Sequence, residues 1–198
     1  MTELKDLKRK HKKLETMIKK ATINRLNDRT SGSWMNLRKL KKPIIAILGF
    51  AKLSDKIDIL KSLLKKVDKV IFAGLVTFTF LKAQGYNVGK TQIDTKKLRT
   101  AKSLLKKYKN NIVLPVDVKV AISESSKPMT VSIKDIPNKY IGYDIGPKSF
   151  ELFTKHISKA KTIFWNGPLG MCENRNYARS THKMAKLLSK KLARVIVG

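Results

Sequence analysis

Residues 43–66 read PIIAILGFAKLSDKIDILKSLLKK, which is an apolar run, a glycine turn and a lysine-bearing amphipathic stretch in that order. The uncharged run 43–48 is typical of a buried strand, and the apolar residues of 54–66 recur at helical spacing. The turn and the helix start carry Lys52 and Lys56. Because backbone N–H groups and the helix dipole attract anions, this arrangement predicts a phosphate-binding turn.

The lysine pair is weak evidence when taken alone. Lys52 and Lys56 lie four residues apart, so they share a face on a helix, and a solvated lysine face explains them equally well. Ser54 is the expected N-cap of the helix. Phe50 stands inside the turn, where its bulk opposes close approach of a ligand to the backbone.

Apolar strands and amphipathic helices alternate along the rest of the chain. This order predicts an α/β fold with a doubly wound, mainly parallel, Rossmann-like sheet flanked by helices. Ligands of such sheets bind beyond the carboxyl ends of the strands, where we expect the turns 49–56, 74–77 and 166–173. The further predicted strands are 69–74, 112–121 (interrupted by Pro115), 162–165 and 194–197, and the helices are 77–84, 94–108, 148–158 and 177–192.

The N-terminal segment 1–33 is predicted to be a basic helical extension, separate from a domain spanning 34–198. Its apolar residues form one narrow stripe at helical spacing, and the helix breaks at Arg29–Ser33. A second short helix is expected over Trp34–Leu40. The stripe suits docking on the domain, on a partner protein or on RNA, and the sequence leaves these alternatives open.

The net charge of +30 arises from 44 basic and 14 acidic residues, an extreme balance for a folded domain. Such a charge favours binding to RNA or to a ribonucleoprotein. Of the basic residues 36 are lysine and 8 are arginine, although arginine is the better phosphate ligand. A genome rich in A and T would also produce this lysine excess. Both readings therefore remain open.

Several classes of protein and site are disfavoured. Cys172 is the only cysteine, which excludes an intrachain disulfide and fits the cytoplasm or another reducing compartment, such as an organelle matrix. The longest uncharged apolar run, 43–51, is nine residues and too short for a membrane span. The three histidines and Cys172 lack the spacing of metal ligands, so no metal site is expected.

Five segments in the same order resemble motifs of the phosphoglycerate kinase family. The segment 46–57 is similar to that family's Gly-Gly-Ala-Lys-Val-Ser-Asp-Lys turn, and the other four match its Thr-Phe-Leu-Lys-Ala-Gln-Gly, Leu-Pro-Val-Asp, Asp-Ile-Gly-Pro-Lys and Trp-Asn-Gly-Pro-Met-Gly motifs. The four are Thr79–Tyr86, Val113–Val118, Gly142–Lys148 and Trp165–Gly170. The resemblance covers residues from Met35 onward and only the C-terminal, nucleotide-binding half of the family.

The resemblance implies binding of MgADP or MgATP. It implies that Lys52 faces the transferring phosphoryl group as a catalytic residue and that Lys56 contacts the nucleotide phosphates beside Gly49. It also places adenine against Gly74 and assigns the ribose hydroxyls to Glu173. The remaining implied residues, which line the nucleotide cleft, are Asn166, Gly167 and Pro168.

Departures from the family pattern predict a degenerate domain. Phe50 replaces a turn glycine, and in 73–77 only Gly74 remains of three, so Leu75 and Val76 are expected to fill adenine space. The family's magnesium-binding Gly-Gly-Asp turn and its phosphoglycerate-binding half have no counterpart in the 198 residues. We therefore predict a pseudoenzyme that, as a lone chain, does not transfer phosphate between 1,3-bisphosphoglycerate and ADP in glycolysis. The alternative is a structural or RNA-binding component of a ribosome-like particle.

Overall fold

A five-stranded parallel sheet is the centre of the fold in the computed structural model, which describes residues 40–197. The strand order is β3-β2-β1-β7-β8, and every neighbouring pair is parallel. The bounds are β1 Ile44–Gly49, β2 Lys69–Ala73, β3 Ile112–Val113, β7 Thr162–Asn166 and β8 Arg194–Val197. Because β2 and β7 lie on opposite sides of β1, the chain reverses its winding direction there.

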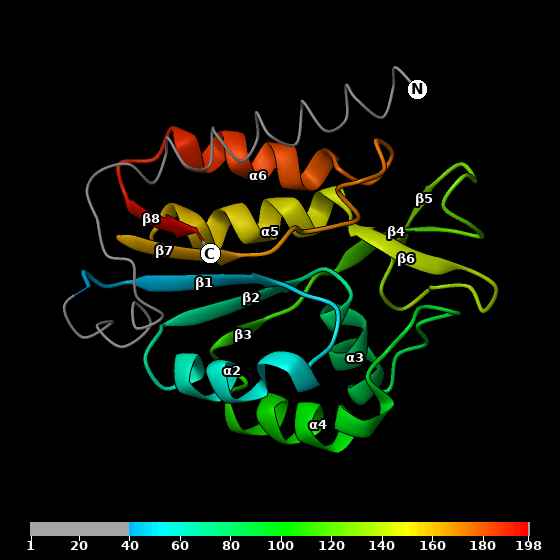
Figure 1. Cartoon of the computed structure of the whole chain (residues 1–198), viewed down its shortest axis with the longest axis horizontal. Helices are drawn as coiled ribbons and strands as arrows, with labels where there is room; N and C mark the ends of the chain where they lie inside the picture. Colours follow the sequence, from blue (N-terminus) through cyan, green and yellow to red (C-terminus); the bar gives the residue numbers. More distant parts are fainter. Residues whose placement is uncertain (1–39, 198) are drawn as a thin grey trace.

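Helices cover both faces of this sheet, as Figure 1 shows. One face carries α2 (Ile57–Leu64), α3 (Val76–Ala83) and α4 (Leu98–Lys107), and the 3₁₀ turns Ser54–Lys56 and Thr95–Lys97 precede α2 and α4. The other face carries α5 (Pro147–Ser158) and α6 (Arg179–Ser189). The predicted α/β class with a mainly parallel sheet between helices is confirmed.

The central position of β1 in the parallel sheet explains why its sequence is apolar throughout. Ile44, Ala46 and Leu48 pack in a core on the α2–α4 face, whereas Ile45 and Ile47 pack in a second core with α5 and α6. All five side chains are at most 3% exposed. A central parallel strand buried on both faces cannot alternate apolar and polar residues.

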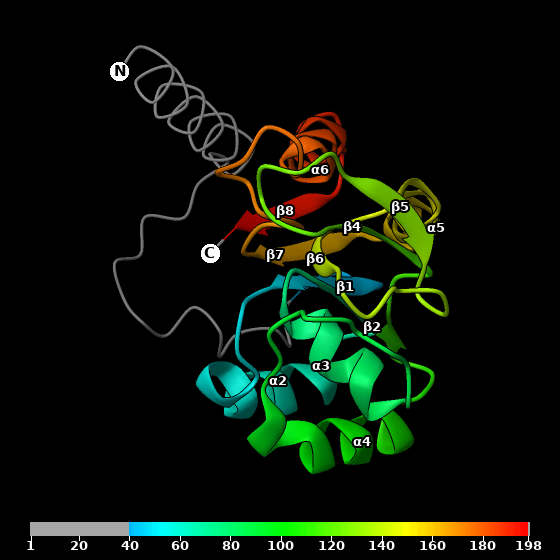
Figure 2. The same ribbon diagram turned by 90° about the vertical axis from the view of Figure 1, so that its right-hand side faces the viewer.

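A second, antiparallel sheet of order β5-β4-β6 stands beyond one end of the parallel sheet (Figure 1) and faces the viewer in Figure 2. It consists of β4 Asp117–Ala121, β5 Met129–Ser132 and β6 Ile141–Ile145. The prediction of one strand over 112–121 was therefore wrong, because β3 and β4 belong to different sheets. Between them the chain leaves the parallel sheet at Pro115, which has no N–H to donate, and the Ser149 hydroxyl accepts from the next two backbone N–H groups.

Other element ends differ by a few residues from the prediction. The helix expected over 54–66 starts as a 3₁₀ turn and ends at Leu64, and the helix expected over 177–192 spans Arg179–Ser189. The predicted helix over 1–30 and the boundary at 33/34 lie outside the described residues, as does nearly all of the helix expected over Trp34–Leu40. Across residues 40–197, none of the helices has the length and apolar character needed to span a bilayer.

Candidate functional site

The turns after β1 and β7 meet through their backbones at the point where the winding direction reverses. A Cβ added at Gly49 would lie 2.7 Å from the carbonyl carbon of Pro168 and still closer to its oxygen. Gly167 has a positive φ of 80°, and a Cβ there would collide with the Gly49 carbonyl. These two glycines allow the carboxyl ends of β1 and β7 to touch.

The turn after β2 joins the same junction. Gly74 adopts a φ of 66°, a left-handed conformation that side chains disfavour. Its N–H donates to the Leu169 carbonyl at 2.9 Å, and the Val76 N–H donates to the Phe50 carbonyl at 2.8 Å. Backbone hydrogen bonds therefore bind the three strand ends into one rigid edge.

Lys56 reaches across this edge to the last residue of β7. Its Nζ donates to Asn166 Oδ1 at 2.5 Å and lies 5.7 Å from the centroid of the Phe50 ring. Phe50 is itself half-buried and packs against the core on the α2–α4 face, which explains how a bulky residue is accommodated in the turn. Lys52 is exposed. Of the two predicted phosphate ligands, the structure brings only Lys56 to Asn166.

The start of the helix after the turn differs from the expected capping arrangement. Leu53, not Ser54, occupies the N-cap position of the 3₁₀ turn, and no side chain caps it. The Ser54 N–H donates instead to Asp94 Oδ2 at 2.8 Å. A carboxylate of the same chain thus occupies one of the backbone donors at the start of this helix.

A cavity of about 530 Å³ lies against these strand ends, and residues of the antiparallel sheet form part of its wall. Four of the predicted nucleotide residues line it, namely Gly49, Gly74, Pro168 and Glu173. The other four, Lys52, Lys56, Asn166 and Gly167, do not. The structure therefore separates the predicted site into a cavity and an adjoining Lys56–Asn166 pair.

The cavity remains open although bulky residues stand where the family resemblance implies glycines. Phe50 and Leu75 line it, as expected from their positions, while Val76 is fully buried in the core on the α2–α4 face. The prediction that Val76 fills adenine space was therefore wrong, because the first turn of α3 directs this side chain to the core. A volume of this size falls within the range of small-molecule sites.

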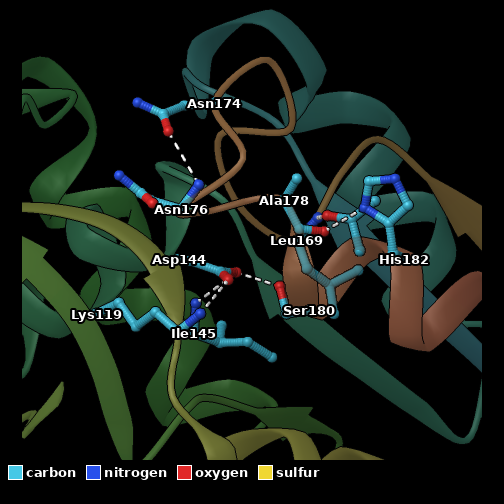
Figure 3. A network of polar contacts seen from close by, with 10 residues as sticks. Lys119, Asp144, Ile145, Leu169, Asn174, Asn176, Ala178, Ser180 and His182 are labelled. Atoms are coloured by element: carbon cyan, nitrogen blue, oxygen red, sulfur yellow. Dashed lines mark hydrogen bonds and ion pairs between the residues drawn. The ribbon is translucent and has the colours of Figure 1, made fainter. Parts of the chain in front are cut away.

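Two buried polar groups in the cavity wall were missed from the sequence. The Asp144 carboxylate accepts from the Ser180 hydroxyl and from the Ile145 N–H and pairs with Lys119 at 3.4 Å (Figure 3). Burial nevertheless raises the pKa of Asp144 above its ordinary value. The Thr77 hydroxyl is buried and has no hydrogen-bond partner within the described part of the chain. Asp144 stood within the Gly142–Lys148 motif, but no local signal indicated the burial of either side chain.

Metal ligands and nucleophiles are not gathered in the described region. Among residues 40–197, no group of three or more histidine, cysteine or acidic side chains could hold a metal ion. Burial raises the pKa of the Cys172 thiol to about 11, with a smaller contribution from Glu173, so the thiol is protonated at neutral pH. In this part of the chain, the charged groups near the cavity are therefore lysines and separate carboxylates, and not a thiolate or a cluster of metal ligands.

Comparison with known proteins gives one consistent family. The family model described as Phosphoglycerate kinase matches residues 27–198. The phosphoglycerate kinase of Rubrobacter xylanophilus is 42% identical over 164 residues, which cover 82% of this chain and 42% of the relative. That of Fusobacterium nucleatum is 48% identical over 144 residues, covering 71% of this chain and 36% of the relative.

Solved structures agree with these relatives. Phosphoglycerate kinase from Coxiella burnetii superimposes with a TM-score of 0.78 at 38% identity, covering 81% of this chain and 43% of that protein. The enzyme from Pyrococcus horikoshii OT3 gives a TM-score of 0.71 at 22% identity, which supports the fold. This chain spans less than half the length of each of these proteins.

Proposed function

The chain belongs to the phosphoglycerate kinase family, and we propose that residues 40–197 bind an adenine nucleotide, MgADP or MgATP, at the edge where β1, β2 and β7 end. The observation that carries this proposal is the convergence of a ligand-sized cavity and the Lys56–Asn166 pair on one turn, Gly49–Lys56. A cavity suits the base, and an adjoining cation suits phosphates.

Each part of the nucleotide has a proposed partner. Adenine lies against Gly74 and Leu75 in the cavity, whose unpartnered Thr77 hydroxyl is suited to a polar group of the base. The exposed carboxylate of Glu173 accepts from the ribose hydroxyls. Near the phosphates, Gly49, Gly167 and Pro168 form the backbone wall beside Lys56 and Asn166.

Phosphoryl transfer, in this proposal, needs residues beyond these 198. The solvent-exposed Lys52 is free to neutralise charge on a transferring phosphoryl group, which is the role proposed for it. Such transfer depends on holding both substrates in line. The proposed site in residues 40–197 accounts for the nucleotide and not for a second substrate, so we propose that the chain alone binds nucleotide without turning over 1,3-bisphosphoglycerate.

Calorimetric titration of the full chain with MgADP tests the proposal. Wild type is expected to bind, and Lys56→Met to bind about 10- to 100-fold more weakly, because a hydrogen bond from a charged donor is worth about 1.5–3 kcal/mol. Lys186→Met, on the exposed face of α6, is the control and leaves binding unchanged. No heat of binding and no rise in melting temperature at millimolar MgADP would refute the proposal.

RNA binding is the second candidate, supported by the charge balance. The chain carries +30, and within residues 40–197 only three ion pairs form, so most lysines have no acidic partner there. In this reading the protein is a component of a ribonucleoprotein in the cytoplasm or an organelle matrix, and Lys52 and Lys56 contact RNA phosphates. Affinity for RNA would then fall steeply with salt. If Lys52→Ala and Lys56→Ala weaken RNA binding but leave MgADP binding unchanged, RNA is the better assignment.

A further inference from the structure

A groove of about 770 Å³ runs between the C-terminal parts of α3 and α4, at the β3 edge of the parallel sheet. Figures 1 and 2 both show α3 and α4 side by side on the same face of the sheet. The groove shares no lining residue with the nucleotide cavity. Its role is therefore separate from the proposed nucleotide site.

The rim of the groove is formed by lysines. Lys82 comes from α3, Lys102 and Lys106 come from α4, and Lys109 follows α4. All four are exposed, and none forms an ion pair within the described residues. No acidic residue lines the groove, and none occurs in the sequence 95–116 that supplies most of it. The groove therefore presents unneutralised positive charge.

The floor of the groove is aliphatic. Leu105, Ile112 and Leu114 line it and are each partly exposed. Neither arginine nor an aromatic side chain lines the groove. Aliphatic side chains give no stacking surface for bases, and arginine is the residue that recognises phosphate bidentately. The floor thus suits apolar side chains better than nucleotides.

Helix dipoles explain only part of the lysine rim. Lys82 and Lys106 lie in the last turns of their helices, where a cation offsets the negative end of the dipole. Lys102 lies in the middle of α4 and Lys109 lies beyond its end. The dipole also gives no reason for a partly exposed aliphatic floor between the lysines.

We propose that this groove binds an acidic, amphipathic peptide segment of a partner protein. Carboxylates of the peptide pair with Lys82, Lys102, Lys106 and Lys109, while its aliphatic side chains cover Leu105, Ile112 and Leu114. Charge repulsion between two chains of net charge +30 disfavours a second copy of this chain as the occupant. Because the groove combines a basic rim with an apolar floor, a matching ligand carries both acidic and aliphatic side chains.

The probe is a short fluorescein-labelled peptide of alternating glutamate and leucine, titrated with the full chain and followed by fluorescence anisotropy. Polyglutamate of equal length and oligouridine RNA serve as comparison ligands. The Glu-Leu peptide is expected to bind at least about tenfold more tightly than polyglutamate, because its leucine side chains bury apolar surface that polyglutamate lacks. Millimolar MgADP is expected to leave this affinity unchanged.

Two variants assign the binding to the groove. The double variant Lys102→Glu/Lys106→Glu is expected to lose at least about tenfold in peptide affinity. The control Lys61→Glu/Lys65→Glu makes the same charge change at the same spacing, on α2 and its C-cap, and is expected to lose far less. Leu105→Gln, checked for an unchanged fold by its melting curve, weakens the Glu-Leu peptide but not polyglutamate.

Three outcomes would overturn the proposal. Equal binding of polyglutamate and the Glu-Leu peptide would remove the role of the aliphatic floor. Equal losses in the two double variants would show a general charge effect. Tighter binding of oligouridine than of the peptide, with the same dependence on Lys102 and Lys106, would assign the groove to nucleic acid.

Discussion

Replacing Gly49 by alanine tests the junction on which the candidate site is built. In the structure this residue is the last of β1, and its backbone contacts the turn after β7. The added Cβ would lie 2.7 Å from the carbonyl carbon of Pro168, closer than real Cβ atoms approach, and 3.1 Å from that of Gly167. The opposing atoms belong to backbone, so they cannot rotate away as a side chain could.

The expected cost follows from this overlap. Inserting a methyl group into a closely packed site costs about 1–3 kcal/mol, and a backbone neighbour places Gly49→Ala at about 3 kcal/mol or more. For a domain of this size, that corresponds to a fall in melting temperature of about 6–12 °C. Because the contact exists without ligand, the loss is expected whether or not MgADP is present.

Urea denaturation of wild type, Gly49→Ala and Gly85→Ala measures this cost. Gly85 is the matched control, since its φ is 95° but nothing lies within 4 Å of an added Cβ. Gly85→Ala should therefore cost only the left-handed strain of about 1–2 kcal/mol. If Gly49→Ala costs no more than Gly85→Ala, the strand ends do not meet as described and the proposed site loses its basis.

Three further predictions concern side chains at the site. Phe50→Leu keeps an apolar side chain but removes the ring beside Lys56, so MgADP affinity is expected to rise about two- to fivefold, by about 0.5–1 kcal/mol; calorimetry giving an unchanged affinity would contradict this. Asp144 has a pKa raised above 3.8, so its contribution to stability is present at lower pH and is lost as pH rises through the raised pKa. The free energy of unfolding of Asp144→Asn, measured by urea at several pH values, should therefore increase relative to wild type from about pH 4 upward, whereas a difference independent of pH would argue against burial of the charge. Cys172, whose pKa is raised from 9.0 to about 11, should react with iodoacetamide at neutral pH far more slowly in the native than in the unfolded protein; equal rates would disprove its protection.

The parallel sheet was predictable because its evidence is local. Strand β1 is buried on both faces, so its run of apolar residues is continuous and easily recognised. The glycine turn and the amphipathic α2 follow within a few residues. Burial and helical periodicity both act over short stretches, and the sequence records them directly.

The antiparallel sheet was not predictable because its pairing is distant and its strands are weakly marked. Val118 pairs with Val131 and with Ile145, and none of the four residues of β5 is buried. Pro115 indicated an interruption between 112 and 121, but a proline does not specify that the chain changes sheets. Pairing partners are decided by tertiary packing, which no local pattern records.

In the candidate site, too, local features were predictable from the sequence and distant contacts were not. The motif resemblance selected Lys56 and Asn166, but these two residues are 110 positions apart in the sequence. The hydrogen bond from the Ser54 N–H to Asp94 likewise connects residues 40 positions apart. The sequence therefore selected Lys56 and Asn166 but did not indicate the contacts that they make. Which lysine approaches the β7 turn, and which donor is already occupied, depends on how distant loops pack.

The turn glycines that the family resemblance implies have two separate roles. Gly49, Gly167 and Gly74 are present in this chain, and at these positions a side chain would collide with backbone or strain a positive φ. Leu75, by contrast, has φ −65° and ψ −31°, a conformation open to any residue. A leucine at this position, where the resemblance implies a glycine, thus leaves the turn geometry intact and changes only the space open to a ligand. Stability measurements therefore cannot decide whether the site binds nucleotide. Measurements of nucleotide affinity in Phe50 and Lys56 variants can decide it.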